Sequence, residues 1–398
     1  MEHDRLRIAM VSAEEPSTGQ RVHVAGLSAA LARRGHAVTA YTRLESALSP
    51  DRERTELGYD VVRLSAGPVV PIDENEMISQ LGRLADLLGR EWRDAPPDVV
   101  HAHGWTSGLA SVLAEHQGIP VVQTYYGLGG SVRRSLAERI VGREVTRVAA
   151  MSSNEMLALA RTGVGRSRIS VVPTGVDVQM FTPWGRTAQR GTRSRIVTAA
   201  PQRGLADLVK VLSHVEDAEL LIIGGPGKRR IGQDPGMRRL RALAVNAGVA
   251  DRIVFTGGVS RERTVALLRS ADVVVCTPRC EPVGHVSLEA MACGVPVVAT
   301  AVGALADAVV DGVTGLHVPP GRPRLLAKAL CGLLADGVRR QELGAAARDR
   351  ACARYSWDRI AADTLRAYER AGVRGAGLRK RTKTSRQADG AGRATTVD

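Results

Sequence analysis

Short apolar runs alternate along the chain with longer stretches in which apolar residues recur every three or four positions. The run Leu6–Val11 comes first, a helical stretch over Val22–Arg34 ends at Gly35, and a second run occupies His36–Thr42. Strands buried in parallel sheets have continuous apolar sequences, and helices connect them. The pattern therefore predicts a doubly wound α/β fold from the N-terminus onward.

The same alternation continues to about residue 172. Strands are expected at Asp60–Leu64, Val99–His101, Val121–Gln123, Val148–Ala150 and Ile169–Val172, and helices at Glu74–Arg90, Ser107–His116, Arg134–Glu144 and Ser153–Arg161. No Gly-x-Gly-x-x-Gly sequence follows the first strand, so the dinucleotide-binding fingerprint is missing from its usual place.

A polar, Gly- and Arg-rich stretch interrupts the alternation and predicts a linker over residues 177–194. Beyond it, strands are expected at Arg195–Ala199, Glu219–Ile223, Arg252–Phe255, Asp272–Val275, Val297–Thr300 and Gly315–Val318, with helices between them. The chain should thus form two Rossmann-like domains facing each other across a cleft. We expect these parts at residues 1–176 and 195–355, with a closing helix at 356–372 and a disordered basic tail at 373–398.

The length and the net charge of the chain refine this prediction. A chain of 398 residues exceeds one ordinary hydrophobic core, which agrees with two domains. The net charge is +14, but only five of the 55 basic residues are lysines, which indicates codon bias as much as selection for a polyanion. Aromatic residues make up 3% of the chain, so the basic face with interleaved aromatics that nucleic-acid binding requires is not expected.

The five cysteines all lie in the second half and show no zinc-binding spacing. We interpret them as buried thiols of a cytoplasmic protein. The charged N-terminus does not resemble a signal peptide, and no apolar run reaches 18 residues. Membrane contact is expected to be at most peripheral, through the basic tail. The oligomeric state has no signature in the sequence.

Two carboxylates flank a predicted loop-to-helix turn in the second half. Glu281 follows the strand that ends at Val275, a helix should begin near His285 or Val286, and Glu289 falls in the first turns of that helix. A helix N-terminus favours phosphate groups, and Gly284 would allow a ligand close to the backbone. The two acids could hold hydroxyl groups on either side of a bound phosphate, or could both be surface charges; spacing alone leaves both open.

Further polar residues follow strands of the first half, where ligands of such sheets bind. They include the segment Thr18-Gly19-Gln20, the pair His101 and His103, and the stretch Gln123–Gly130. Metal binding by the two histidines is less favoured than a hydrogen-bonding role, because no cysteine lies nearby in the sequence. Arg134 could meet an anion or be solvated.

Cationic side chains follow two predicted strands of the second half. Arg203 comes after the first of these strands, and Lys228 comes after the second with Arg229 and Arg230 beside it. Fixed cations would stabilise a departing diphosphate, although solvated basic loops would have the same sequence.

Several motifs together resemble those of one enzyme family. They are Arg33–Thr39, Asp98–His103, Arg168–Asp177, Asp311–Gly315 and above all Glu281–Val298, in which seven residues separate Glu281 from Glu289. The chain resembles, over about residues 6–370, the retaining glycosyltransferases of the GT-B fold, in the large E-x7-E family that includes sucrose-phosphate synthases and mycothiol-pathway glycosyltransferases.

The resemblance implies transfer of a hexosyl group, with retention, from a nucleotide-diphosphate sugar to an acceptor hydroxyl. The donor is expected to be UDP- or GDP-linked and to bind the second domain, and a small-molecule, glycan or lipid acceptor would bind the first. No Asp-x-Asp sequence that suits a metal ion is present, in keeping with the family's metal-independent chemistry, and no cofactor is implied. Glu281 would lie near the donor sugar hydroxyls, Glu289 near the ribose, and Gly284, His285 and Val286 at the diphosphate.

The chain also departs from the family pattern. Tyr126 stands where the family has a histidine near the reacting carbon, Gly19 precedes Gln20 in a shortened loop, and Arg203 stands for a lysine while no arginine replaces the family's other cation. The candidate site therefore comprises a catalytic set, a donor-binding set and an acceptor-side set. The catalytic set is Glu281 and Tyr126, and the acceptor-side set is His23 and His103. The donor-binding set is Gly19, Gln20, Arg134, Arg203, Lys228, Gly284, His285, Val286 and Glu289. The alternatives are a non-catalytic GT-B-fold protein that binds a nucleotide, sugar or protein, and a nucleotide-sugar epimerase.

Overall fold

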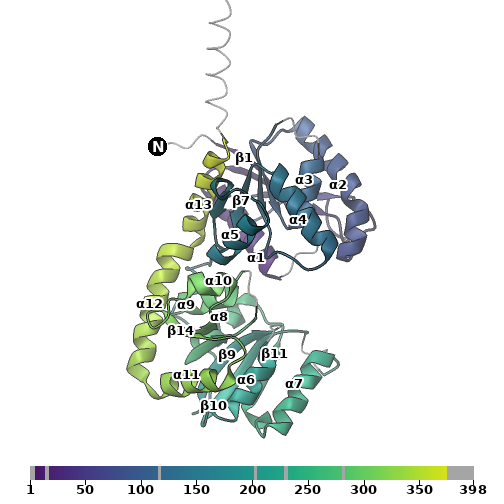
Figure 1. Ribbon diagram of the computed structural model, residues 1–398. Coiled ribbons are helices and arrows are strands. Elements are labelled where there is room, and N and C mark those ends of the chain that lie inside the picture. The colour runs from purple at the N-terminus through teal and green to yellow at the C-terminus, as the bar shows by residue number, and fades with distance from the viewer. Residues whose placement is uncertain are drawn as a thin grey trace, which may run out of the picture. The chain divides into compact units, whose positions relative to one another are not determined.

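The structure is a computed structural model that describes residues 5–13, 18–114, 118–200, 204–227, 232–279 and 283–373. The described residues divide into two compact units (Figure 1). Unit 1 runs to Met151, includes Met156–Val172 and resumes at Ala361, while unit 2 comprises Ser152–Glu155 and Pro173–Ile360.

Two segments belong to units other than those that the sequence pattern predicted for them. Residues 177–194, expected as a linker, lie in unit 2, because Phe181 is fully buried in its core and Arg348 donates a hydrogen bond of 2.8 Å to the Phe181 carbonyl. The closing helix α13 (Trp357–Arg370) leaves unit 2 after Ile360, and its remaining turns pack in unit 1.

Unit 1 contains an eight-stranded sheet among the described residues, in the order β3-β4-β2-β1-β5-β6-β7-β8. All neighbouring strands are parallel except β3 and β4. The strands are β1 (Arg7–Val11), β2 (Ala37–Arg43), β3 (Arg52–Arg54), β4 (Asp60–Leu64), β5 (Val99–His103), β6 (Val121–Thr124), β7 (Arg147–Ala150) and β8 (Ile169–Val171). The edge strand β3 was not predicted, because its sequence Arg-Glu-Arg is polar and fully exposed.

The helices of unit 1 are α1 (Thr18–Arg33), α2 (Glu74–Asp94), α3 (Trp105–Leu113), α4 (Val132–Glu144), most of α5 (Ser153–Arg161) and the later turns of α13. A capping box begins α2, since Asp73 accepts a hydrogen bond from Glu76 N–H at 2.9 Å and Glu76 accepts one from Asp73 N–H at 3.1 Å. Helix α1 begins four residues before the predicted position, so Gly19 and Gln20 lie in its first turn rather than in a loop.

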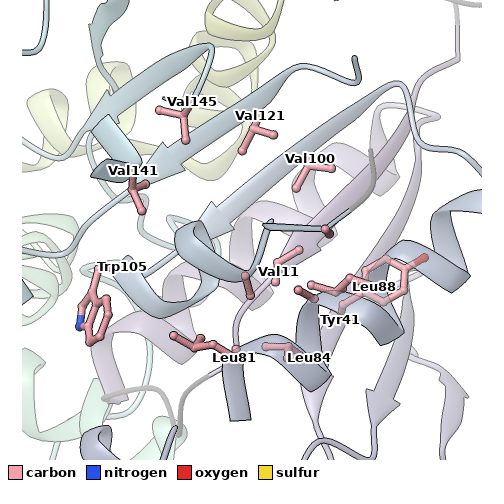
Figure 2. Packing of buried hydrophobic residues seen from close by; sticks show 14 of the residues in the cluster. Val11, Tyr41, Leu81, Leu84, Leu88, Val100, Trp105, Val121, Val141 and Val145 are labelled. Atoms are coloured by element: carbon pink, nitrogen blue, oxygen red, sulfur yellow. The ribbon is translucent and has the colours of Figure 1, made fainter. Parts of the chain in front are cut away.

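The core of unit 1 follows from the two-residue period of its strands. Val11, Val100 and Val121 of neighbouring strands pack against Leu84 of α2 and Val141 of α4 (Figure 2). Helices α2, α3 and α4 cover this face, and each contacts the next. Apolar residues at intervening positions face the other side of the sheet, as expected for strands covered on both faces.

Unit 2 contains a six-stranded, fully parallel sheet in the described residues, ordered β11-β10-β9-β12-β13-β14. Its strands are β9 (Ser194–Ala200), β10 (Ala218–Gly224), β11 (Ile253–Gly257), β12 (Val273–Cys276), β13 (Val297–Thr300) and β14 (Gly315–Val318). Its helices are α6 (Leu205–Leu212), α7 (Pro235–Asn246), α8 (Arg261–Arg269), α9 (His285–Ala292), α10 (Gly303–Ala308), α11 (Pro323–Ala335) and α12 (Gly337–Tyr355).

Alternate residues of these strands enter two separate apolar clusters. Val197 and Val274 join the cluster beneath α8, α9, α10 and α12, whereas Ile196 and Val273 join the cluster beneath α6, α7 and α11. A sheet covered on both faces explains why its strands have continuous apolar sequences. Two parallel-sheet α/β units therefore confirm the predicted fold class. No helix among the described residues is both long and apolar enough to cross a membrane.

The strand order reverses between β1 and β5 in unit 1 and between β9 and β12 in unit 2. Ligands of open α/β sheets bind outside the carboxyl ends of the strands at such reversals. These two points locate the polar residues that are described next.

Candidate active site

Glu289 lies in the second turn of α9, the helix that follows β12 in unit 2. The residue is 9% exposed, which excludes its interpretation as a surface charge. Arg261, at the start of α8, places a guanidinium nitrogen 3.7 Å from the carboxylate and is itself stacked over the Phe181 ring at 5.2 Å. Burial raises the pKa of Glu289 to about 7, and Arg261 opposes that increase. The carboxyl group is thus poised to change charge near neutral pH.

The N-terminus of α9 is formed by Gly284 in the left-handed conformation, with a φ of 75°. Glycine provides no side chain that could cap the first-turn N–H groups of the helix, which have no intrahelical acceptors. Ser287 donates a hydrogen bond of 2.6 Å back to the Gly284 carbonyl and holds this turn in place. A helix start of this kind is suited to an anion.

His285 and Val286 begin α9, as predicted. His285 Nε2 lies 3.5 Å from Thr174 Oγ1, at the start of unit 2. The Val286 side chain is partly buried against the cluster beneath α9, so a role at a diphosphate would fall to its backbone.

The loops after β9 and β12 approach each other closely at the reversal point of unit 2. A Cβ atom on Gly204 would lie 2.4 Å from the Thr277 carbonyl oxygen, so only glycine fits there. Thr300 fixes the second loop further, because its hydroxyl donates a 2.7 Å hydrogen bond to the Pro278 carbonyl. Three predicted site residues on neighbouring segments, Arg203, Lys228 and Glu281, fall outside the described residues.

Gln20 and His103 meet at the reversal point of unit 1. The Gln20 side-chain amide donates hydrogen bonds of 3.2 Å to the His103 carbonyl and to Ser12 Oγ. These bonds join the start of α1 to the carboxyl ends of β1 and β5. Gly19 directly precedes Gln20 in the same turn.

A cluster of aromatic and imidazole rings surrounds His103. The His103 ring centroid lies 4.3 Å from that of His101, 5.7 Å from that of His23 and 6.0 Å from that of Tyr126. His103 Nδ1 is 2.9 Å from the Tyr126 hydroxyl. Burial lowers the pKa of His103 well below its ordinary value, and His101 and His23 lower it further, so the ring is neutral. Predicted residues from α1, β5 and the segment after β6 therefore form one group.

Arg134 has partners in its own unit. Its side chain is 26% exposed and donates to Glu138 Oε1 at 2.8 Å and to the Gly127 carbonyl at 3.0 Å. Glu138 in turn accepts a hydrogen bond of 2.9 Å from Gly129 N–H. Arg134 thus helps to hold the glycine-rich loop after Tyr126, a role that the sequence did not reveal.

Several residues of these groups escaped sequence analysis. Arg261, Thr174, Met10 and Tyr368 touch candidate residues through contacts that spacing along the sequence does not indicate. Within the described ranges, no three His, Cys, Asp or Glu side chains are grouped as metal ligands.

Comparisons with known proteins agree over most of the chain. Residues 17–180 match the model of Glycosyltransferase Family 4, and residues 196–350 match that of Glycosyl transferases group 1. A D-inositol 3-phosphate glycosyltransferase from Xylanimonas cellulosilytica is 36% identical over 408 aligned residues, which cover 92% of this chain and 97% of the relative.

Solved structures have the same architecture. The sucrose-phosphate synthase of Thermosynechococcus elongatus is 26% identical, with a TM-score of 0.82 and coverage of 92% of this chain and 98% of that chain. Anabaena HepE in complex with UDP-glucose is 19% identical, with a TM-score of 0.73 over 91% of this chain and 100% of that chain, which supports the fold alone. The chain therefore belongs to the GT-B-fold glycosyltransferases of group 1, the family of the D-inositol 3-phosphate glycosyltransferases.

Proposed function

We propose that this glycosyltransferase moves a hexosyl group from a UDP- or GDP-linked sugar to an acceptor hydroxyl, with retention of configuration and without a metal ion. Donor assignment is supported by the UDP-glucose complex of Anabaena HepE, which has the same fold. The names of the relatives make D-inositol 3-phosphate the first acceptor to test.

The buried Glu289 carboxyl beside the start of α9 is the observation that carries this proposal. A buried carboxyl group needs hydrogen-bond donors, and the vicinal hydroxyls of a ribose provide two. The adjacent helix start offers backbone N–H groups to a diphosphate. Nucleoside and diphosphate would thus lie along one short segment, Gly284–Glu289.

In the reaction that we propose, the bond between the anomeric carbon and the diphosphate oxygen breaks, and the acceptor oxygen bonds to that carbon on the same face. The acceptor proton passes to the departing phosphate oxygen, so no protein base is required. The N–H groups at the start of α9 would stabilise the charge that develops on the diphosphate. Glu281 and Tyr126 would orient the donor sugar, and His23 and His103 would lie on the acceptor side.

A transfer assay tests the proposal directly. The protein would be incubated with UDP-, GDP- and ADP-sugars and with D-inositol 3-phosphate, and the anomeric configuration of the product would be read by NMR. Turnover with retention, undiminished by EDTA, is expected for a UDP- or GDP-sugar. Binding of a donor without turnover of any donor or acceptor would instead favour the non-catalytic alternative, and an inverted product would contradict retention.

A further inference from the structure

Helix α4 carries apolar residues on two opposite sides. Its inward side is buried in the core of unit 1, where Val141 is fully enclosed and α4 contacts α3 (Figure 1). Its outward side carries Val132, Leu136 and Ile140, which are 85%, 54% and 43% exposed. A surface helix normally presents polar and charged residues to water on that side. Core packing of α4 therefore does not explain these three residues, which we call the outer stripe.

Exposed large apolar residues are scattered singly over the other helices. Among the described residues, no helix except α4 carries more than one, and the single examples are Leu113 on α3, Leu157 on α5, Val245 on α7, Leu325 on α11 and Val338 on α12. Single exposed residues are normal, whereas a contiguous apolar patch marks a surface that another molecule covers. Residues four positions apart are neighbours on a helix, so the outer stripe is one ridge that spans about 80° of the helix circumference.

Arginines flank the outer stripe on both sides. Helical geometry places Arg133 on the side of Ile140, Arg139 on the opposite side, and Arg143 at the C-terminal end of the stripe. All three arginines are exposed, and in the part of the chain that the structure describes none pairs with a carboxylate. The exposed acid of α4 is Glu144, its last residue. The outer stripe and its three arginines, together the outer face, are thus apolar along the middle and positively charged at the margins.

A second copy of the chain fits the outer face poorly. Two α4 helices packed antiparallel about Leu136 would place Arg139 of each copy beside Arg133 of the other, and parallel packing would set each arginine against its own counterpart. Like charges held close together repel. The sequence of α4 also contains no aromatic residue, whereas aromatic anchors are enriched at the centres of protein interfaces. The occupant should therefore be anionic and should accept a narrow aliphatic ridge.

We propose that the outer face of α4 docks on an anionic lipid bilayer, with the outer stripe at the boundary between headgroups and acyl chains. An interfacial helix lies in the plane of the membrane, buries its apolar side and directs basic side chains to the lipid phosphates. Arginine suits this arrangement, since its aliphatic stem packs beside apolar residues while the guanidinium binds phosphate. Three aliphatic side chains and three arginines give reversible attachment. The outer face contains none of the candidate site residues, so the inference does not depend on the proposed function.

Sedimentation with vesicles tests the apolar part of this surface on the full chain. The wild type should bind vesicles made of equal parts of phosphatidylcholine and phosphatidylglycerol, and should bind pure phosphatidylcholine vesicles much more weakly. Leu136→Asn combined with Ile140→Asn should weaken binding to the anionic vesicles by about tenfold or more, because apolar surface no longer enters the membrane. Val245→Asn combined with Val338→Asn is the matched control, since it removes two exposed aliphatic side chains from α7 and α12 and should bind like the wild type.

The same vesicles test the arginines. Arg139→Gln combined with Arg143→Gln should weaken binding by about ten- to thirtyfold at low salt, as expected for two cations near an anionic membrane. Arg238→Gln combined with Arg239→Gln is the matched control, because it removes two exposed arginines from α7 and should reduce binding much less.

The basic sequence 374–398 provides a competing explanation for vesicle binding, because it can attract anionic lipid by charge alone. That attraction should survive Leu136→Asn with Ile140→Asn, which leaves every charge in place. Undiminished vesicle binding by this variant would overturn the proposal, as would a wild type that binds neither kind of vesicle. If the variant loses self-association in analytical ultracentrifugation but keeps vesicle binding, the outer face is an interface between copies of the chain and the proposal is wrong.

Discussion

The carboxyl group of Glu289 is largely withdrawn from water, and the Arg261 guanidinium lies 3.7 Å away. Arg261 is stacked on Phe181 and 44% exposed at its side chain, so it compensates the buried charge only in part. The raised pKa of Glu289 follows from this imbalance. In a donor complex, ribose hydroxyls would favour the ionised form.

The pH dependence of stability should report the state of Glu289. Its pKa is raised from 4.5 to about 7, so folding takes up a proton between these two pH values. The contribution of the protonated carboxyl group to the free energy of unfolding is therefore complete below pH 4.5 and is lost as the pH rises through 7. Glu289→Gln has no such titration. Relative to the wild type, its free energy of unfolding should rise between pH 4.5 and 7, by on the order of 3 kcal/mol.

Urea unfolding of both proteins across this pH range measures the difference. Glu342→Gln on α12 is the matched control, because Glu342 is exposed and should change little. A difference between wild type and Glu289→Gln that stays constant with pH would show that the carboxyl is already ionised at pH 4.5. Under the proposed function, Glu289→Gln should also weaken donor binding, whereas Glu342→Gln should not.

At the scale of single residues, spacing indicated where Glu289 and Gly284 would lie but not what surrounds them. The position of Glu289 on α9 follows from helical periodicity after a strand. Its partner Arg261 belongs to α8 and stacks on Phe181 from an earlier segment, and the local sequence around Glu289 contains no information about such contacts. The surroundings of His101 and His103 likewise depend on Tyr368 and Met10, which are distant from them in sequence.

At the scale of elements, the turn into α9 depends on one conformation that only glycine adopts readily. Gly284→Ala would force alanine into the left-handed region at about 1–2 kcal/mol. Gly321→Ala is the matched control, because Gly321 has a φ of 68°, no atom within 4 Å of an added Cβ, and an exposed position away from α9. Both variants should lose similar stability in urea unfolding.

Only Gly284→Ala should also weaken binding of a nucleoside diphosphate, because backbone strain at residue 284 would disturb the turn that presents the start of α9 to a phosphate. Calorimetric titration with UDP and GDP measures this effect. Equal nucleotide affinities for the two alanine variants would remove the start of α9 from the proposed donor site.

Elements with a strong apolar period were predicted with nearly their observed bounds, and β4, α5, β13 and β14 match them residue for residue. In these elements the apolar positions of the sequence coincide with the buried positions of the structure. The misses have local causes. The edge strand β3 is entirely polar, and Gly19 conceals the start of α1, since glycine is an unfavourable helix residue.

At the scale of the molecule, unit 1 is built from both ends of the chain. After Ile360, α13 contributes Leu365 and Tyr368 to unit 1, both less than 7% exposed, and Tyr368 hydrogen-bonds His101 in the central strand β5. Domain prediction from the sequence placed this helix as a separate closing element, because a helical period shows that a face is buried but not what buries it.

A chain that ends after Ile360 should therefore lose stability in unit 1. Burial of the deleted side chains contributes roughly 5 kcal/mol, comparable with the net stability of many domains. Hydrogen–deuterium exchange should become much faster in β5 and β6, while β12 and β13 stay protected. A chain that ends after Val373 lacks only residues 374–398 and is the control. Equal protection of β5 in both chains would contradict the contribution of α13.

The return of α13 to unit 1 also sets the order of events during synthesis. The residues of unit 1 up to Val172 leave the ribosome early, but their last helix is translated only after about 190 further residues, at about 5–20 residues per second. For roughly 10–40 s the nascent first unit lacks α13, so His101 lacks its Tyr368 partner and one face of the sheet is incompletely covered. Unit 2 is completed at Ile360, directly before the remaining turns of α13 are translated. We therefore expect the N-terminal half of this enzyme to depend on chaperones that act on nascent chains.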